Sequence, residues 1–180
     1  MAPKRFWIYV TMMMACLLPS SLVIAQPKSV GVSFSYTGIS LSYEMNSHKS
    51  NSFIDLELKA ENSEFYAGRS KFPGISASAS LNYYLKQWES DNGNTVNLFA
   101  GPGLVMGYCP DYKSLNGVIF GLKGKLGTEC IFNRNVLVSI AIAPILGTHL
   151  LLKDDAVQMK YYRNGLQYAL IPEIGIKYRF

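Results

Sequence analysis

Residues 174–180 read Ile-Gly-Ile-Lys-Tyr-Arg-Phe, so that large apolar side chains alternate with glycine or a cation. Successive side chains of a β-strand point to opposite faces, so this alternation predicts a strand with one apolar and one polar face. The pattern continues back to residue 166, and seven upstream runs follow it: residues 30–36, 39–45, 54–61, 75–86, 96–108, 118–132 and 136–147. Downstream of residue 25 no segment shows a helical period, and the sequence therefore predicts an all-β domain.

The apolar face changes from even to odd positions between Tyr36 and Ile39. A two-residue hairpin turn at Thr37-Gly38 produces this change, because the residues that flank such a turn share a face. The alternative is a bulge within one long strand, which would leave seven strands, an unusual odd number for a bacterial barrel. We prefer the hairpin and predict an eight-stranded antiparallel up-and-down β-barrel.

The polar faces of the runs carry mostly Gly, Ser and Ala, together with isolated charged residues. The interior of an eight-stranded barrel has room for little more. Six acids balance six cations, as a narrow interior requires, because an unpaired buried charge is costly. We therefore predict that the polar faces point inward as a charge network and that the apolar faces point toward lipid, which makes the barrel transmembrane. The network comprises Glu44, Asp55, Glu57, Lys59, Glu61, Lys86, Lys123, Lys125, Glu129, Glu173, Lys177 and Arg179.

Aromatic residues gather at both ends of the apolar faces, as in the aromatic belts of outer-membrane barrels. One end carries Tyr36, Tyr108, Phe120 and Tyr168, and the other carries Tyr43, Tyr83, Phe132, Tyr178 and Phe180. Loop lengths support the same orientation. The connections 46–51, 87–94 and 133–135 are short or moderate and fall on the periplasmic side, while 62–73, 109–115 and 151–165 are mostly longer and fall on the outer side.

The first 25 residues have the layout of a secretory signal peptide, with Lys4 and Arg5, an apolar stretch and a small-residue site that ends at Ala25. An uncleaved anchor and a lipoprotein attached at Cys16 are the alternatives. We expect cleavage after Ala25, so that residues 26–180 form one barrel domain. Removing Lys4 and Arg5 lowers the formal net charge from +5 to +3, which does not argue for nucleic-acid binding.

The C-terminal run resembles the terminal strand of small bacterial outer-membrane β-barrel proteins of the OmpA and OmpX type, and the similarity extends over residues 26–180. In that family an aromatic C-terminal residue, preceded by alternating apolar residues, is the signal that the barrel assembly machinery reads. The resemblance assigns this role to Phe180, Tyr178, Ile176 and Ile174. The chain lacks the peptidoglycan-binding domain that follows the barrel in OmpA, so a cell-wall tether is not expected.

Few residues offer catalytic or metal chemistry. His48 and His149 are the only histidines, no cluster of Cys and His has the spacing of a zinc site, and no cofactor is expected. Cys109 and Cys130 fall at opposite ends of adjacent predicted strands and on opposite faces. We therefore expect two free thiols instead of a disulfide.

The expected function is that of a non-enzymatic outer-membrane barrel with a charged, plugged interior, which acts structurally or through the loops 62–73 and 151–165. Its partners would be outer-membrane lipid and the assembly machinery. One alternative is a lipid-modifying enzyme on a small barrel, in which Thr148 and His149 would form the nucleophile and base. Another is a soluble periplasmic barrel that binds a small apolar ligand.

Overall fold

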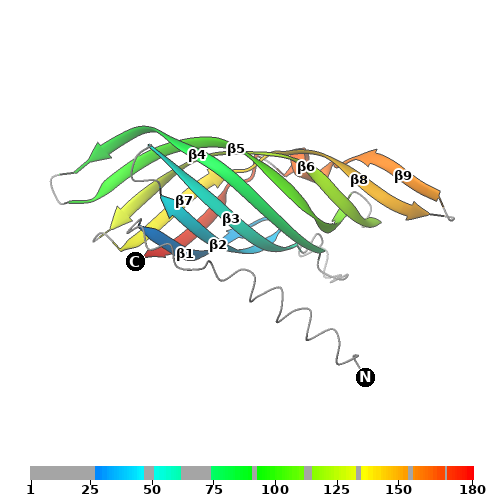
Figure 1. Ribbon diagram of the computed structural model, residues 1–180, viewed down its shortest axis with the longest axis horizontal. Helices are drawn as coiled ribbons and strands as arrows, with labels where there is room; N and C mark the ends of the chain where they lie inside the picture. Colours follow the sequence, from blue (N-terminus) through cyan, green and yellow to red (C-terminus); the bar gives the residue numbers. More distant parts are fainter. Residues whose placement is uncertain are drawn as a thin grey trace, which may run out of the picture.

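The computed structural model describes residues 27–46, 51–61, 74–90, 93–111, 115–132, 135–153, 156–168 and 170–180. The predicted signal peptide, the loop 62–73 and His48 lie outside the described residues. Within them the chain forms strands and one short helix (Figure 1). The elements are β1 (Lys28–Ser35), β2 (Gly38–Asn46), β3 (Ser52–Glu61), β4 (Gly74–Glu89), β5 (Thr95–Asp111), β6 (Leu115–Phe132), β7 (Val136–Ile142), β8 (Ile145–Lys153), β9 (Ala156–Tyr161), α2 (Asn164–Gln167) and β10 (Glu173–Arg179).

The strands close into an eight-stranded antiparallel β-barrel, which confirms the predicted fold. β1 to β6 pair in chain order, β6 pairs with β7, β7 with β10, and β10 with β1. β7 and β8 both pair with β6, so they are two parts of one barrel strand. They are separated at Ala143 and Pro144, where the proline lacks the N–H group that a continuous strand needs.

The strands are strongly tilted. Following directly paired residues once around the barrel leads from Phe132 of β6 back to Leu122 of the same strand, ten residues away. The path passes through Val136, Tyr178, Val30, Tyr43, Leu56, Ala79 and Leu104. A stagger of this size corresponds to strands inclined by about 35–45° to the barrel axis, with an interior that side chains can fill.

The β1–β2 connection is a hairpin, as predicted, and the alternative of a bulge within one long strand is excluded. Ser35 pairs with Gly38, so the two turn residues are Tyr36 and Thr37, one position earlier than the expected Thr37-Gly38. Gly38 has a positive φ of 157°, and a Cβ atom at this position would collide with the carbonyl oxygen of Ala60 on β3. Glycine is therefore required here for close contact between β2 and β3.

We call the end of the barrel that holds this turn the upper end, and the end that holds Lys28 and Phe180 the lower end, which lies at the left in Figure 1. β5, β6 and β8 continue past the upper end of the barrel. β9 lies farthest out, because it pairs with β8 alone (Figure 1). Among the described residues, no helix is long and apolar enough to cross a membrane.

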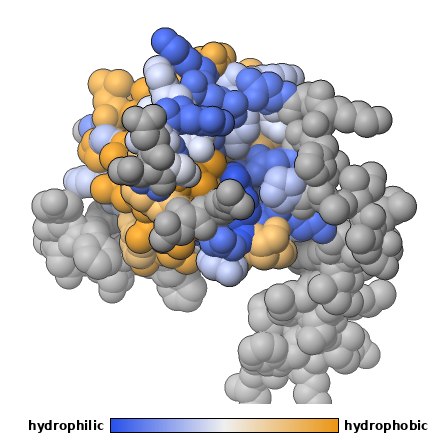
Figure 2. Space-filling model, turned by 90° about the vertical axis from the view of Figure 1, so that its left-hand side faces the viewer, coloured by the Kyte–Doolittle hydropathy of each residue, from blue (hydrophilic) through white to orange (hydrophobic). Residues whose placement is uncertain are grey.

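The two faces of the strands differ in the predicted sense. The outer face of the barrel carries large apolar side chains that are exposed, such as Val32, Leu41, Leu58 and Ile174. The inner face carries buried serines and charged residues. When the molecule is viewed from its lower end, apolar residues form much of the left flank, while hydrophilic residues gather at the top and near the centre (Figure 2).

Two predicted boundaries are wrong. The last barrel strand begins at Glu173 instead of residue 166, because the preceding residues form α2 and a turn, and Pro172 cannot donate a strand hydrogen bond. The predicted loop 151–165 contains the end of β8 and all of β9. β9 alternates Val157, Met159 and Tyr161 with smaller or polar residues, so the signal for a strand was present in the sequence.

Candidate functional site

The barrel interior is built around Lys125 of β6. Its ammonium group lies 2.5 Å from Asp55 Oδ2 and 3.3 Å from Glu173 Oε1, and it also contacts Glu57. These three carboxylates come from β3 and β10, so the lysine links strands that are distant in the barrel wall. All four side chains are at least nine-tenths buried.

Two further lysines complete a continuous network of ion pairs. Lys123 Nζ contacts Glu57 and lies 3.0 Å from Ser78 Oγ. Lys177 Nζ donates to Glu44 Oε2 over 2.8 Å and lies 4.0 Å from Asp55. Three buried cations thus share four buried carboxylates. Buried ions are tolerated when they are paired and hydrogen-bonded in this way.

The remaining interior carboxylates are held by neutral donors. Glu61 accepts from Tyr162 Oη at 3.2 Å and from Ser76 Oγ at 3.0 Å. Glu129 accepts from Tyr84 Oη and Asn97 Nδ2, both at 3.0 Å. Neither carboxylate has a cation within 4.0 Å among the described residues. Tyrosine, asparagine and serine side chains therefore donate hydrogen bonds to the two carboxylates that the lysines do not reach.

Of the twelve predicted network residues, eleven lie on the inner face. Nine are buried: Glu44, Asp55, Glu57, Glu61, Lys123, Lys125, Glu129, Glu173 and Lys177. Lys59 and Arg179 are half-buried, at opposite ends of the barrel. Lys59 Nζ donates to Thr37 Oγ1 over 2.5 Å.

The prediction is wrong for Lys86. A register shift between Tyr84 and Lys86 inserts one extra residue into β4, so Lys86 pairs with Leu98, an outward-facing residue of β5. Such a bulge moves every following side chain to the other face. Lys86 is exposed, and its ammonium group lies 5.0 Å from the ring centre of Trp88. The interior of the predicted set therefore holds six acids and five cations, not six of each.

An aromatic cluster closes the lower part of the interior. Phe53 and Phe99 are each 1% exposed, and their ring centroids lie 5.3 Å apart. The Tyr84 ring lies 5.0 Å from Phe53, and Ala141 completes the cluster. The sequence pattern assigned Tyr84 and Phe99 to a polar face, and Phe53 lies just before the predicted run 54–61, so this aromatic cluster was not predicted.

The upper mouth is covered by the segment that joins β9 to β10. We call the described residues 162–168 and 170–172 of this segment the strap. The Asp111 carboxylate at the end of β5 accepts the backbone N–H groups of Asn164 at 2.9 Å and of Arg163 at 3.2 Å. Asn164 Nδ2 also donates to the carbonyl oxygen of Pro110 at 3.2 Å. The strap is therefore tied to β5 where α2 begins.

Tyr162 is the deepest strap residue. It is 2% exposed and packs with Val105, Cys109 and Ile119. Burial raises the pKa of the Tyr162 phenol above its usual range, and the nearby Glu61 carboxylate raises it further, so the hydroxyl stays protonated and donates to Glu61. The contacts that Tyr162 and Asp111 make at the upper mouth were not predicted, because both residues lie in segments that the sequence pattern assigned to loops.

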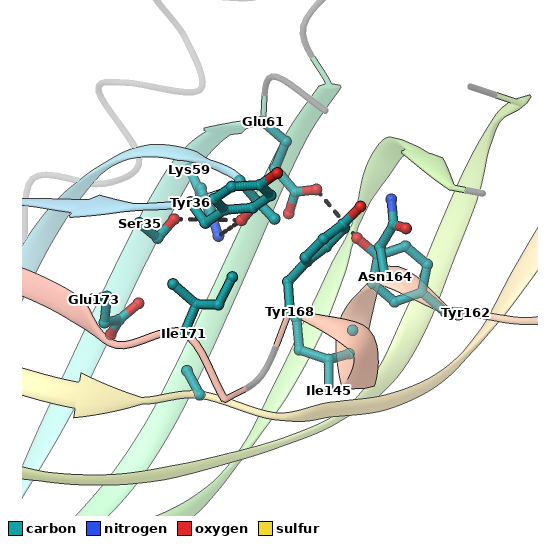
Figure 3. A pocket seen from close by; sticks show the side chains of 13 residues that line it. Ser35, Tyr36, Lys59, Glu61, Ile145, Tyr162, Asn164, Tyr168, Ile171 and Glu173 are labelled. Atoms are coloured by element: carbon teal, nitrogen blue, oxygen red, sulfur yellow. Dashed lines mark hydrogen bonds between the residues drawn. The ribbon is translucent and has the colours of Figure 1, made fainter. Parts of the chain in front are cut away.

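A small cavity of about 40 Å³ lies beneath the strap. Tyr36, Tyr162 and Tyr168 surround it together with Lys59 and Glu61 (Figure 3). Pockets for small organic ligands typically measure about 300–1,000 Å³, so this cavity has no room for one.

Thr148 and His149 do not form a catalytic pair in this structure. As successive residues of β8 they point to opposite faces. The Thr148 hydroxyl donates to the Phe120 carbonyl at 3.4 Å, while the His149 ring is fully buried with Nε2 2.9 Å from the Cys109 carbonyl. Among the described residues, no group of three or more His, Cys, Asp and Glu side chains is placed to hold a metal ion.

Cys109 and Cys130 are free thiols, as predicted. The C-terminal residues Ile174, Ile176 and Tyr178 face outward, with exposed fractions above one half, and Phe180 is 63% exposed. Phe180 also closes the barrel, because its backbone exchanges hydrogen bonds with Lys28 at 2.9 and 3.2 Å.

Comparison with known proteins identified no relative: no protein-family model, curated protein or solved structure matches this chain.

Proposed function

We propose that the chain is a bacterial outer-membrane β-barrel protein that carries no enzymatic activity and acts structurally or through its upper end. The observation that carries this proposal is the inverted polarity of the barrel, with apolar side chains outside and paired charges inside. A soluble barrel places its large apolar residues in the interior. Lipid is the partner that matches the outer face of this one.

The dimensions of the outer face are consistent with a membrane. β1, β2 and β3 have 8, 9 and 10 residues, near the 9–11 that a tilted transmembrane strand needs. Across these strands Val32, Leu41 and Leu58 are neighbours on the outer face and are 40–54% exposed. Water would contact all three, whereas lipid would cover them.

The interior favours a structural role over transport. The aromatic cluster fills the lower part, the lysine network fills the middle, and the strap covers the upper mouth. A barrel blocked at three levels is expected to give no large, stable conductance in a planar bilayer. The same filling leaves no room for the apolar ligand of a soluble carrier.

The upper end is where contact with the cell exterior would occur, through β9 and the segments around it. The outward residues Ile174, Ile176, Tyr178 and Phe180 are the proposed signal for the barrel assembly machinery, by resemblance to small outer-membrane barrels. The predicted signal peptide, residues 1–25, would supply the route of export.

Two arginine substitutions test the proposal. Leu41→Arg places a charge in the middle of the outer face, and Val157→Arg places one on β9, at positions that are 54% and 70% exposed. If both positions faced water, neither arginine should lower the stability of the barrel. Near the centre of a bilayer an arginine costs about 2–4 kcal/mol, so only Leu41→Arg should destabilise the protein in phosphatidylcholine vesicles.

The measurement is denaturant unfolding in vesicles, with folding followed by the shift in gel mobility between unheated and boiled samples. Cell fractionation of the wild type should place it in the outer membrane. Equal stabilities for the two variants, or recovery of the wild type in the soluble periplasm, would refute the proposal.

A further inference from the structure

The strap carries large apolar side chains that are exposed. Leu166 is 44% exposed, Ile171 is 41% exposed, and Leu170 is 82% exposed, the highest value for a large apolar residue in the described chain. The strap contains only one charged residue, Arg163. Isolated apolar residues on a surface need no explanation, but three within six positions form a patch.

The interior contacts of the strap hold this patch in place. Tyr162 is buried against Cys109 and Ile119, and Asp111 accepts two backbone N–H groups where α2 begins. At the other end of the strap, the Tyr168 ring lies 4.9 Å from that of Tyr36 in the β1–β2 turn. Tyr168 and Ile171 line the cavity beneath the strap, whereas Leu166 and Leu170 do not.

The patch continues the apolar outer face of the barrel. Leu170 lies in the turn that leads into β10, four residues before Ile174, which is 51% exposed. Ile174 lies between Phe34 of β1 and Ile140 of β7, which are also about half exposed. The strap therefore adds exposed apolar side chains next to the start of β10 and, through the Tyr168–Tyr36 contact, next to the β1–β2 turn.

β9 shows that exposure alone does not place a residue against lipid. Val157 and Met159 are 70% and 71% exposed, but Met159 pairs with Leu150, which pairs with Val118. Val118 lies two residues beyond Phe120, one of the aromatic residues at the upper rim. The strand tilt shifts each successive strand toward the upper end of the barrel. β9 therefore lies above the apolar face that the strap extends.

We infer that the strap is an interfacial lipid anchor, in which Leu166 and Leu170 insert among the acyl chains of the upper leaflet. The inference rests on the proposed membrane location of the barrel. It names lipid as the occupant because the patch is continuous with the outer face and ends at an aromatic pair, the residue type that favours the membrane interface. The strap then joins lipid on one side to the barrel mouth on the other.

Single-tryptophan variants test this anchor. In a full-length background that carries Trp7→Phe and Trp88→Phe, one tryptophan is placed at Leu170, at Leu41 or at Val157. Each variant is folded into phosphatidylcholine vesicles whose acyl chains are brominated either near the glycerol or near the chain ends. Bromine quenches tryptophan only on contact.

Leu170→Trp should lose about half of its emission in shallow-brominated lipid and less in deep-brominated lipid, as expected for an interfacial aromatic. Leu41→Trp should be quenched most strongly by the deep label, and Val157→Trp should not be quenched. If Leu170→Trp resembles Val157→Trp while Leu41→Trp is quenched, the anchor is refuted and the membrane barrel stands. If Leu41→Trp is also unquenched, the proposed function fails together with the anchor.

Discussion

The Tyr162 hydroxyl donates a hydrogen bond to Glu61 Oε2 over 3.2 Å, and this contact joins the strap to β3 across the upper mouth of the barrel. Both side chains are buried, at 2% and 4% exposure. Among the described carboxylates of the predicted network, Glu61 is one of two without a lysine within 4.0 Å, and the other, Glu129, is held by Tyr84 near the lower end. Each end of the lysine network is thus completed by a tyrosine.

Opening of the strap can be followed through Cys109, which is fully buried against Tyr162. Asp111→Ala removes the acceptor for two backbone N–H groups, each worth about 1 kcal/mol or more when left unpaired. In a background with Cys16→Ser and Cys130→Ser, the variant should raise the rate of Cys109 labelling by a water-soluble maleimide by about tenfold.

Asp111→Asn is the matched control, because it keeps one carbonyl oxygen as an acceptor and should give an intermediate rate. A reporter at Cys130, on β6 near the lower end, should respond to neither change when Cys109 is replaced by serine. Unchanged Cys109 labelling in Asp111→Ala would mean that the strap is held by other contacts.

The lysine network should respond strongly to loss of its central cation. Lys125→Met leaves Asp55, Glu57 and Glu173 without their shared partner, and breaking a buried pair in this way costs about 3–5 kcal/mol. Lys86→Met removes a lysine that is exposed beside Trp88, and should cost at most about 1 kcal/mol. Denaturant unfolding in vesicles measures both.

Addition of Asp55→Asn to Lys125→Met should restore part of the lost stability, since it removes a buried carboxylate that has lost its nearest cation. Equal effects of the two single lysine variants would contradict the ion pairs described for the interior.

The alternation of the sequence was sufficient to predict the strands, and the small residues and balanced charges of the polar face indicated that this face points inward. The same reasoning placed eleven of twelve charged residues on the inner face. It failed at Lys86, because Leu85 continues the alternation without a break while the backbone inserts it as a bulge. No residue type marks that insertion in the sequence.

The sequence did not predict the strap as a segment separate from the last strand, and the reason is different. Leu166, Tyr168 and Leu170 alternate with smaller or polar residues and extend the pattern of β10 by coincidence. The last barrel strand begins only at Glu173 for two reasons. Pro172 cannot donate a strand hydrogen bond, and Asp111 binds the backbone N–H group of Asn164. That contact joins residues 53 positions apart, and local patterns carry no information about it.

The tight β1–β2 hairpin depends on Gly38. A Cβ atom there would collide with the Ala60 carbonyl, so Gly38→Ala should destabilise the barrel by about 1–3 kcal/mol, the usual cost of overpacking. Gly93 is the matched control: its φ is also positive, at 75°, but nothing lies within 4 Å of an added Cβ atom. Gly93→Ala should therefore cost only about 1 kcal/mol of backbone strain. Equal losses would mean that β2 can move away from β3.

The final prediction separates assembly in the cell from stability in the membrane. Phe180 is 63% exposed on the outer face, and its backbone, not its ring, makes the hydrogen bonds to Lys28. Phe180→Ala should therefore leave unfolding in vesicles within about 1 kcal/mol of the wild type. In cells it should lower the amount of heat-modifiable barrel in the outer-membrane fraction several-fold, because the proposed assembly signal is lost. Phe34→Ala removes a ring of similar exposure, 52%, from β1 and leaves the C-terminus intact, so its membrane level should fall much less. If the two variants accumulate equally in the membrane, Phe180 is an ordinary lipid-facing residue and the C-terminal strand carries no signal of its own.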